Sequence, residues 1–103
     1  MIGLDTSAII DLFKGNLRIK EILSENKEPL AATVISYLEL FFGLDIKISK
    51  HEIEAKYYQD FFKNLYYIDL TKESCEKASE IFWKLKKEGK SIDQFDCVIA
   101  ALF

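Results

Sequence analysis

Residues 1–10 read MIGLDTSAII, and this short stretch indicates the fold class. Residues 1–5 are mostly apolar up to Asp5, which is typical of a short buried strand that ends on a charged residue. Between Ser7 and Lys14, apolar residues recur at a spacing nearer that of a helix than of a strand. A strand that leads directly into a helix is the usual beginning of an α/β domain.

The remaining chain continues this alternation. A second helix is predicted from Leu17 to about Asn26, before the only proline, Pro29. PLAATVIS (29–36) predicts a buried strand and its exit, and NLYYIDL (64–70) predicts a third strand. The other predicted helices cover residues 36–43, 47–62, 71–88 and 91–103. Strands alternating with helices predict an α/β fold in which helices flank a parallel sheet.

Serine and threonine residues mark three of the predicted helix starts. Ser36 with Glu39 has the spacing of a capping box, and Ser91 with Gln94 repeats the pattern. Thr71 is the predicted cap of the long helix. On that helix the periodicity directs one set of residues inward and one set outward. The inward set is Cys75, Ala78, Ile81, Phe82 and Leu85, and the outward set is Lys84, Lys86, Lys87 and Lys90.

Length and composition limit the class of protein. The 103 residues form one domain, 1–103, and half of them are hydrophobic, as a packed core requires. No apolar run has the length of a membrane span, and acidic Asp5 stands where a signal peptide carries basic residues, so a soluble cytoplasmic protein is expected. Cys75 and Cys97 lack metal-type spacing and are expected to be reduced thiols. The net charge of −3 means that any nucleic-acid contact requires a local patch or a bound metal.

Three acidic residues have both a functional and a structural interpretation. Asp5 follows the first strand, and ligands bind at the carboxyl ends of strands in open α/β sheets, yet an aspartate there also caps a helix. Glu39 has the same ambiguity within its capping box. Asp96 precedes the apolar run CVIAALF, where a buried acid requires a partner or a metal, although an exposed first-turn acid also complements the helix dipole.

Convergence of these acids on one pocket would have a chemical consequence. Their mutual repulsion would demand a cation, and oxygen ligands without histidine or cysteine favour Mg²⁺ or Mn²⁺ over zinc. A metal held in this way activates water and offsets charge at a phosphodiester. The acids therefore raise the hypothesis of a metal-dependent nuclease.

Three segments resemble PIN-domain ribonucleases, in the order and with the rough separations of their short VapC toxin members: MIGLDTSAIIDLFKGN (1–16), ATVISYLELFFG (32–43) and IDQFDCVIAAL (92–102). The resemblance covers residues 1–103 and implies a metal-dependent ribonuclease that acts as the toxin of a toxin–antitoxin pair. It implies metal-binding, catalytic roles for Asp5, Glu39 and Asp96, with Thr6 and Ser7 shaping the site. Asp93 is an outer candidate, because one helical turn from Asp96 it would share the same helix face. It further implies Mg²⁺ or Mn²⁺ as cofactor, an RNA substrate, a VapB-type antitoxin and a homodimer.

The chain departs from this family at its end. Members usually continue into a last strand and a fourth acid, whereas this chain stops at Phe103 within an apolar run. We therefore expect a C-terminally truncated domain that lacks the last strand. The alternative function is a catalytically silent PIN-like module that binds a protein or RNA, because the fourth acid is missing.

Two groups of residues have open interpretations in that setting. The four outward lysines of the long helix either steer RNA phosphates or form a solvated face. The aromatic residues Tyr57, Tyr58, Phe61 and Phe62 either fill the core, which is favoured, or face the antitoxin or a second subunit.

Overall fold

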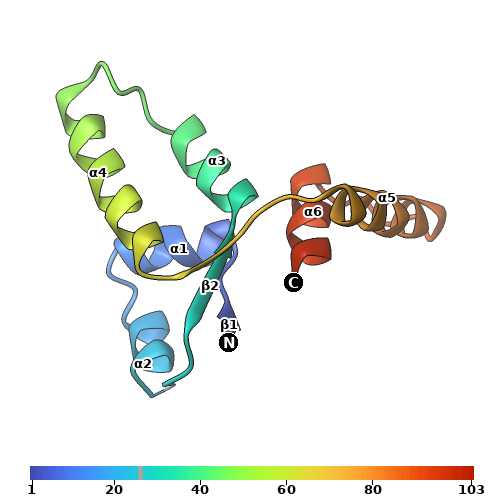
Figure 1. Cartoon of the computed structure of the whole chain (residues 1–103), viewed down its shortest axis with the longest axis horizontal. Helices are drawn as coiled ribbons and strands as arrows, with labels where there is room; N and C mark the ends of the chain where they lie inside the picture. Colours follow the sequence, from blue (N-terminus) through green and yellow to red (C-terminus); the bar gives the residue numbers. More distant parts are fainter. Residues whose placement is uncertain (26) are drawn as a thin grey trace.

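The computed structural model of the chain describes residues 1–25 and 27–103, in which three strands alternate with six helices (Figure 1). The elements in chain order are β1 (Ile2–Gly3), α1 (Thr6–Phe13), α2 (Leu17–Glu25), β2 (Leu30–Thr33), α3 (Val34–Phe42), α4 (Ser49–Lys63), β3 (Tyr66–Ile68), α5 (Lys72–Lys87) and α6 (Gln94–Leu102). The alternation predicted from the sequence is therefore confirmed.

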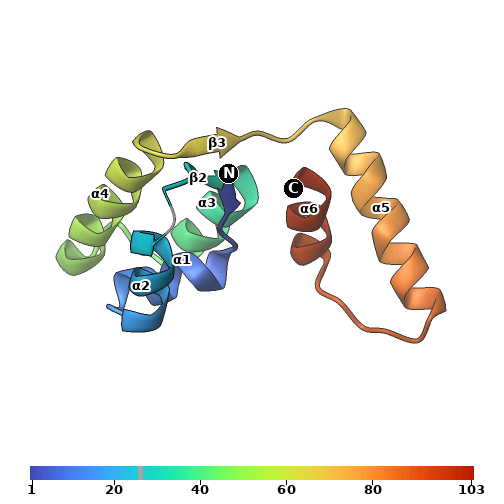
Figure 2. The same cartoon turned by 90° about the horizontal axis from the view of Figure 1, so that it is seen from below.

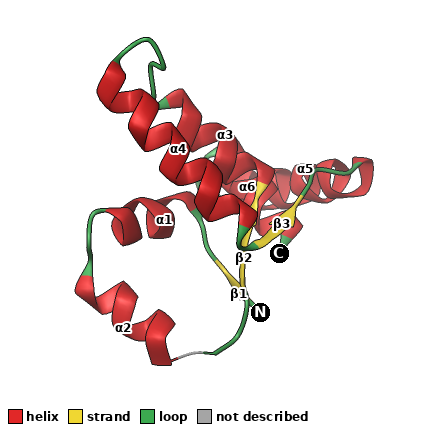
Figure 3. Ribbon diagram, turned by 60° about the vertical axis from the view of Figure 1, so that its left-hand side comes forward, coloured by secondary structure: helices red, strands yellow, loops and turns green. Residues whose placement is uncertain are grey.

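The strands form a parallel sheet in the order β1–β2–β3. β2 is the central strand, with Ala31 opposite Tyr66 of β3. Ala31, Ala32 and Thr33 are completely buried, as is usual for a parallel strand covered by helices on both faces. Figure 3 shows that the short strands are a small part of the molecule compared with the helices. The predicted fold class, a parallel sheet flanked by helices, is confirmed.

The helices lie on two sides of this sheet. α1 to α4 gather on one side, and α5 and α6 form an antiparallel pair on the other (Figures 1 and 2). The end of α6 reaches β1, because the Phe103 ring lies against the backbone of Gly3. A Cβ atom at Gly3 would be only 2.6 Å from the nearest ring atom, so any other residue here would displace the Phe103 ring.

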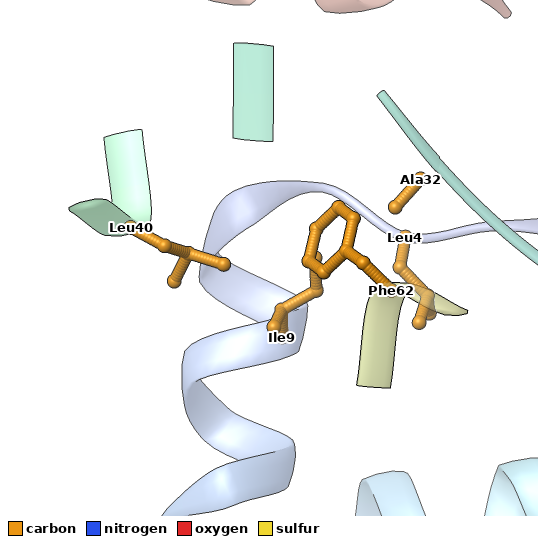
Figure 4. Packing of buried hydrophobic residues seen from close by; sticks show 5 residues of the cluster. All are labelled: Leu4, Ile9, Ala32, Leu40 and Phe62. Carbon is orange, nitrogen blue, oxygen red and sulfur yellow. The ribbon is translucent and has the colours of Figure 1, made fainter. Parts of the chain in front are cut away.

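The core lies between the sheet and the first four helices. Its buried residues are Leu4, Ile9, Ala32, Leu40 and Phe62, which come from five separate segments (Figure 4). Of these, Ile9 and Ala32 are fully buried. The core therefore fixes α1, α3 and α4 against the end of β1 and against β2.

The aromatic residues of α4 serve this core to different degrees. Phe62 is buried, and Tyr58 and Phe61 are partly buried against it. Both of these partly buried rings also contact Phe13 of α1 edge-on, with ring centroids 4.9 and 5.3 Å apart. Tyr57, by contrast, is 60% exposed. Core filling, the favoured interpretation of these aromatics, therefore holds for three of the four residues.

β1 is shorter than the strand predicted over residues 1–5. Its parallel pairing does continue to Leu4, whose N–H donates to the Ala31 carbonyl at 2.7 Å. Asp5 already has the role of N-cap of α1, so the strand stops before it. α2, α4 and α5 begin and end within two residues of the predicted helices. The predicted end of the second helix, Asn26, lies outside the described residues.

The predicted capping box at Ser36 and Glu39 is wrong. α3 begins at Val34, and its N-cap is Thr33, whose side chain accepts a hydrogen bond from the Ser36 N–H at 3.3 Å. The β-branched pair Val34–Ile35 suggested a continuing strand, but packing of α3 against the core outweighs that local preference. Ser36 is therefore a fully buried residue inside the helix, and Glu39 is free of any capping role.

The cap predicted at Ser91 and Gln94 is also wrong, because Asp93 caps α6. The Asp93 side chain accepts hydrogen bonds from two N–H groups of the first turn of α6, that of Phe95 at 2.8 Å and that of Asp96 at 3.4 Å. The predicted cap at Thr71 is confirmed, and Ser74 completes a reciprocal capping box there.

Two details of the described residues qualify the composition-based predictions. Cys75 was predicted to face inward but is exposed, because Ser74 and Ala78 are the buried residues of α5. Cys97 is buried. Both cysteines are free thiols, as predicted. None of the helices in the described part of the chain is both long and apolar enough to cross a membrane.

Candidate functional site

Seven residues from three distant segments line one pocket of about 470 Å³, which we call the acid pocket: Asp5, Thr6, Ser7, Ile10, Glu39, Asp93 and Asp96. The pocket lies where β1 runs into α1, beside the middle of α3 and the start of α6. All six polar residues that the sequence analysis singled out for the site are therefore neighbours in space. Ile10 is the addition; as an apolar residue on a helix it carries no sequence signal for a site.

Asp5 caps α1 and also lines the acid pocket. Its Oδ1 accepts a hydrogen bond from the Ala8 N–H at 2.8 Å and so caps α1. The side chain nevertheless lines the acid pocket and is exposed there. A carboxylate has two oxygens with about four acceptor positions, so capping with one oxygen leaves the other for a ligand. The N-terminus of α1 also favours negative charge at this position.

Glu39 is held in place by the helix on the opposite side of the pocket. Its Oε1 accepts a hydrogen bond from the Thr6 hydroxyl at 2.8 Å. A second hydrogen bond, of 3.1 Å, links the Thr6 and Ser36 hydroxyls. Since Ser36 is fully buried one helical turn before Glu39, it anchors Thr6, and Thr6 in turn orients the carboxylate.

Ser36 is the site-shaping residue that the sequence reasoning missed. The only signal was its spacing from Glu39, which places both residues on one face of a helix, and that signal was assigned to a capping box.

Asp93 and Asp96 form the third side of the acid pocket. Asp93 is the N-cap of α6 and uses its Oδ1 for that cap. It therefore lies just before the helix and not within it. Asp96 lies in the first turn, where the helix dipole stabilises an acid. Its side chain is exposed, so of the two interpretations the exposed first-turn acid holds and the buried acid does not. Within residues 1–25 and 27–103 the Asp96 carboxylate takes part in no hydrogen bond or ion pair.

The acid pocket gathers four carboxylates without a neutralising base. The ion pairs of the described residues lie elsewhere, at the N-terminus with Glu28, at Lys63 with Asp60 and at Lys90 with Glu88. Like charges that line one pocket favour the binding of a cation. The donors are all oxygens, which is the ligand set that suits Mg²⁺ or Mn²⁺.

The carboxylate oxygens are the kind of ligand that such an ion prefers, but the acids do not surround a common point. In the part of the chain that the structure describes, no three His, Cys, Asp or Glu side chains form a group that would hold a metal ion. Asp5 and Asp96 are exposed, whereas Glu39 is half-buried.

Sequence and structure comparisons place this geometry in a known context. The model of the PIN domain family matches residues 2–103 of the chain. Among curated proteins, none matches the sequence closely enough to count as a relative.

Several solved structures share the fold. A toxin–antitoxin complex from Klebsiella pneumoniae is 20% identical, with a TM-score of 0.77 over 98% of this chain and 76% of that one. VapBC2 from Rickettsia felis, bound to a DNA fragment from its promoter, is 24% identical, with a TM-score of 0.82 over 99% and 79%. DNA-bound VapBC from Salmonella typhimurium is 22% identical, with a TM-score of 0.81 over 99% and 79%. At these identities the likeness is one of fold.

Proposed function

The chain belongs to the PIN domain family, and on that premise we propose that it is a metal-dependent ribonuclease and the toxin of a toxin–antitoxin pair. The observation that carries this proposal is the acid pocket, in which four carboxylates from three segments line one hollow of a PIN fold. The toxin role is supported by the fold neighbours, which are a toxin–antitoxin complex and two VapBC complexes.

The proposed cofactor is Mg²⁺ or Mn²⁺, held by Asp5, Glu39 and Asp96. When bound, such an ion activates water and offsets negative charge at a phosphodiester. Asp93 lines the same pocket but already accepts two backbone hydrogen bonds, so we assign it an outer role. Thr6 positions Glu39, and Ser7 shapes the wall beside it.

The chain's own groups perform the remaining work of the site. The hydrogen bond from Thr6 restricts the rotamers of Glu39, so less ordering is needed when substrate arrives. The caps made by Asp5 and Asp93 fix the first turns of α1 and α6, which carry the pocket wall. Because the pocket is acidic, RNA phosphates are repelled from it until a cation is present, and this makes any cleavage depend on metal.

The proposed antitoxin contact is a second hollow, of about 300 Å³, between α1 and α4. It is lined by Ile10, Phe13, Lys14, Glu54, Tyr57 and Tyr58. Tyr57 is the exposed member of the α4 aromatics, and exposed tyrosines are enriched at protein interfaces.

We also propose a homodimer, as the family resemblance implies. Sedimentation of the chain alone tests the homodimer, and sedimentation with a co-expressed antitoxin tests the complex.

The second candidate function is a PIN module that binds without cleaving. It is favoured by one observation, the lack of a closed group of three metal-binding side chains among the described residues. Such a module binds a protein partner or RNA, so binding alone does not distinguish the two candidates, whereas an assay of cleavage does.

The decisive experiment measures cleavage of a quenched fluorescent single-stranded RNA with Mg²⁺, with Mn²⁺ or with EDTA. Asp96→Asn is the best test variant because the Asp96 side chain makes no hydrogen bond within the described residues, so the fold should be unaffected. Asp60→Asn is the matched control, an exposed acid on α4 outside the acid pocket. The proposal requires metal-dependent cleavage that Asp96→Asn abolishes and Asp60→Asn retains. A folded wild-type protein that binds RNA but never cleaves it would establish the binding module instead.

A further inference from the structure

The last turns of α5 carry an aromatic and basic cluster that the proposed catalytic chemistry does not use. Phe82 and Trp83 contact each other edge-on, with ring centroids 5.5 Å apart. The Lys86 ammonium lies 4.9 Å from the centre of the Trp83 ring and 5.8 Å from that of Phe82. With Lys86 in this position, Trp83 is still 51% exposed. A large aromatic surface thus stays open to solvent beside a positive charge.

The charge of this segment is locally positive in a chain with a net charge of −3. Residues 84–90 contain four lysines and one acid. The acid, Glu88, pairs with Lys90 at 3.6 Å, and both side chains are well exposed, so this pair is weak and screened by salt. Lys84, Lys86 and Lys87 form no ion pair among the described residues. Lys86 is the strongest candidate to receive a phosphate, because it is the one whose ammonium lies against the two rings.

A series of adjoining hollows connects this cluster to the acid pocket. One hollow, of about 390 Å³, is lined by Phe82, Lys86, Lys90 and Ile92 among others. It shares Ile92 with the next hollow, of about 330 Å³, which in turn shares Asp93 with the acid pocket. An extended chain of nucleotides lying along the α5–α6 connection would therefore touch all three.

We propose that Phe82, Trp83 and Lys86 form a subsite for single-stranded RNA, in which an unpaired base stacks on the aromatic surface while Lys86 contacts a phosphate. Aromatic residues combined with basic groups are the usual platform for single strands, because every base has a flat face. A paired base presents no free face, so the subsite selects unpaired RNA. This inference rests on the proposed function only for its substrate; the subsite acts in binding, not in bond cleavage.

Trp83 gives a direct test because it is the only tryptophan of the chain. The intact protein is titrated with a short single-stranded RNA in EDTA, so that binding is observed without cleavage. We expect saturable quenching of tryptophan fluorescence, which reports stacking at Trp83 itself. A duplex of the same sequence should quench less.

Variants separate the two contacts. By fluorescence anisotropy of labelled RNA, Trp83→Ala should weaken binding roughly 5- to 150-fold, the range found for loss of one stacked base. Lys86→Ala should reduce the slope of log K against log salt concentration by about 0.7, the value for one phosphate contact to a single strand. Tyr66→Ala and Lys77→Ala are the matched controls, an exposed aromatic on β3 and an exposed lysine earlier on α5. Neither should change affinity or slope.

Each contrary result has a distinct meaning. RNA binding that is unchanged in Trp83→Ala and Lys86→Ala would overturn the subsite, even if the protein cleaves RNA. Binding weakened as expected in a chain that never cleaves would support the subsite while refuting the proposed nuclease. Fluorescence that changes with protein concentration but not with RNA would assign this surface to a second copy of the chain and would overturn the inference.

Discussion

Two substitutions of Asp5 separate its structural role from its proposed role in metal binding. Asp5→Asn keeps a side-chain oxygen that can accept the Ala8 N–H and cap α1, but it removes the charge. Asp5→Ala removes both the cap and the charge. A loss of stability that occurs only in Asp5→Ala is therefore due to the cap. A change that occurs in both variants is due to loss of the carboxylate charge.

The expected magnitudes follow from the 2.8 Å hydrogen bond between Asp5 and the Ala8 N–H. Loss of an N-cap of this kind lowers the free energy of unfolding by about 1 kcal/mol. For a domain of this size, that corresponds to a fall in Tm of roughly 4–8 °C for Asp5→Ala. Without divalent metal, Asp5→Asn should be as stable as the wild type or slightly more stable, because it relieves repulsion among four carboxylates.

Added metal reverses the order of the wild type and Asp5→Asn. A ligand that binds only the folded state raises the free energy of unfolding by about 2.7 kcal/mol at a hundred times its Kd. The wild type should therefore gain Tm as Mg²⁺ or Mn²⁺ is titrated, and Asp5→Asn should gain much less. RNA cleavage should fall at least about 100-fold in both variants, since changes beyond the direct ligands already lower activity by 10- to 100-fold.

The assay is thermal unfolding followed by circular dichroism, in EDTA and across a metal titration, with cleavage measured on the same samples. If Asp5→Asn showed the full metal-induced rise in Tm and cleaved RNA normally, Asp5 would be a helix cap and nothing more. If Asp5→Ala were as stable as Asp5→Asn in EDTA, the capping interaction would be refuted instead.

Three further predictions follow from named contacts. Thr6→Val removes the hydroxyl that donates to Glu39, so kcat should fall while KM for RNA changes little, and the free energy of unfolding should drop by about 1 kcal/mol; unchanged kcat would exclude a positioning role. Ile9→Ala empties the centre of the core, so urea unfolding should show a loss of about 2–5 kcal/mol at an unchanged m value, and a smaller loss would mean that the core collapses around the gap. Burial, with a smaller contribution from Glu54, raises the pKa of Tyr58 above its usual value of 10.0, so its stabilising contribution is complete below pH about 10 and is lost as pH rises through the folded-state pKa; Tyr58→Phe should flatten that alkaline decline in Tm, and an unchanged decline would contradict the assignment.

The fold was predictable because its signals are local and redundant. Apolar runs of strand length, helical periodicity and the single proline each indicate the same alternation of strands and helices. Thr71 was predictable as a cap because its whole pattern lies within a few residues. Ser36 and Ser91 failed because the same local pattern has competing solutions, and burial of α3 and the stronger cap offered by Asp93 decided between them.

The sequence by itself determined the class of fold and the identity of the acidic residues, since periodicity and residue chemistry are written along the chain. Only the tertiary structure brings Asp5, Glu39 and Asp96 to one pocket, because they lie 34 and 57 residues apart along the chain and parallel pairing of β1 with β2 sets their approach. The anchoring of Glu39 by Thr6 and the buried Ser36 likewise depends on packing between distant segments. Such contacts arise from burial and hydrogen bonding across the core, which no pattern of neighbouring residues encodes.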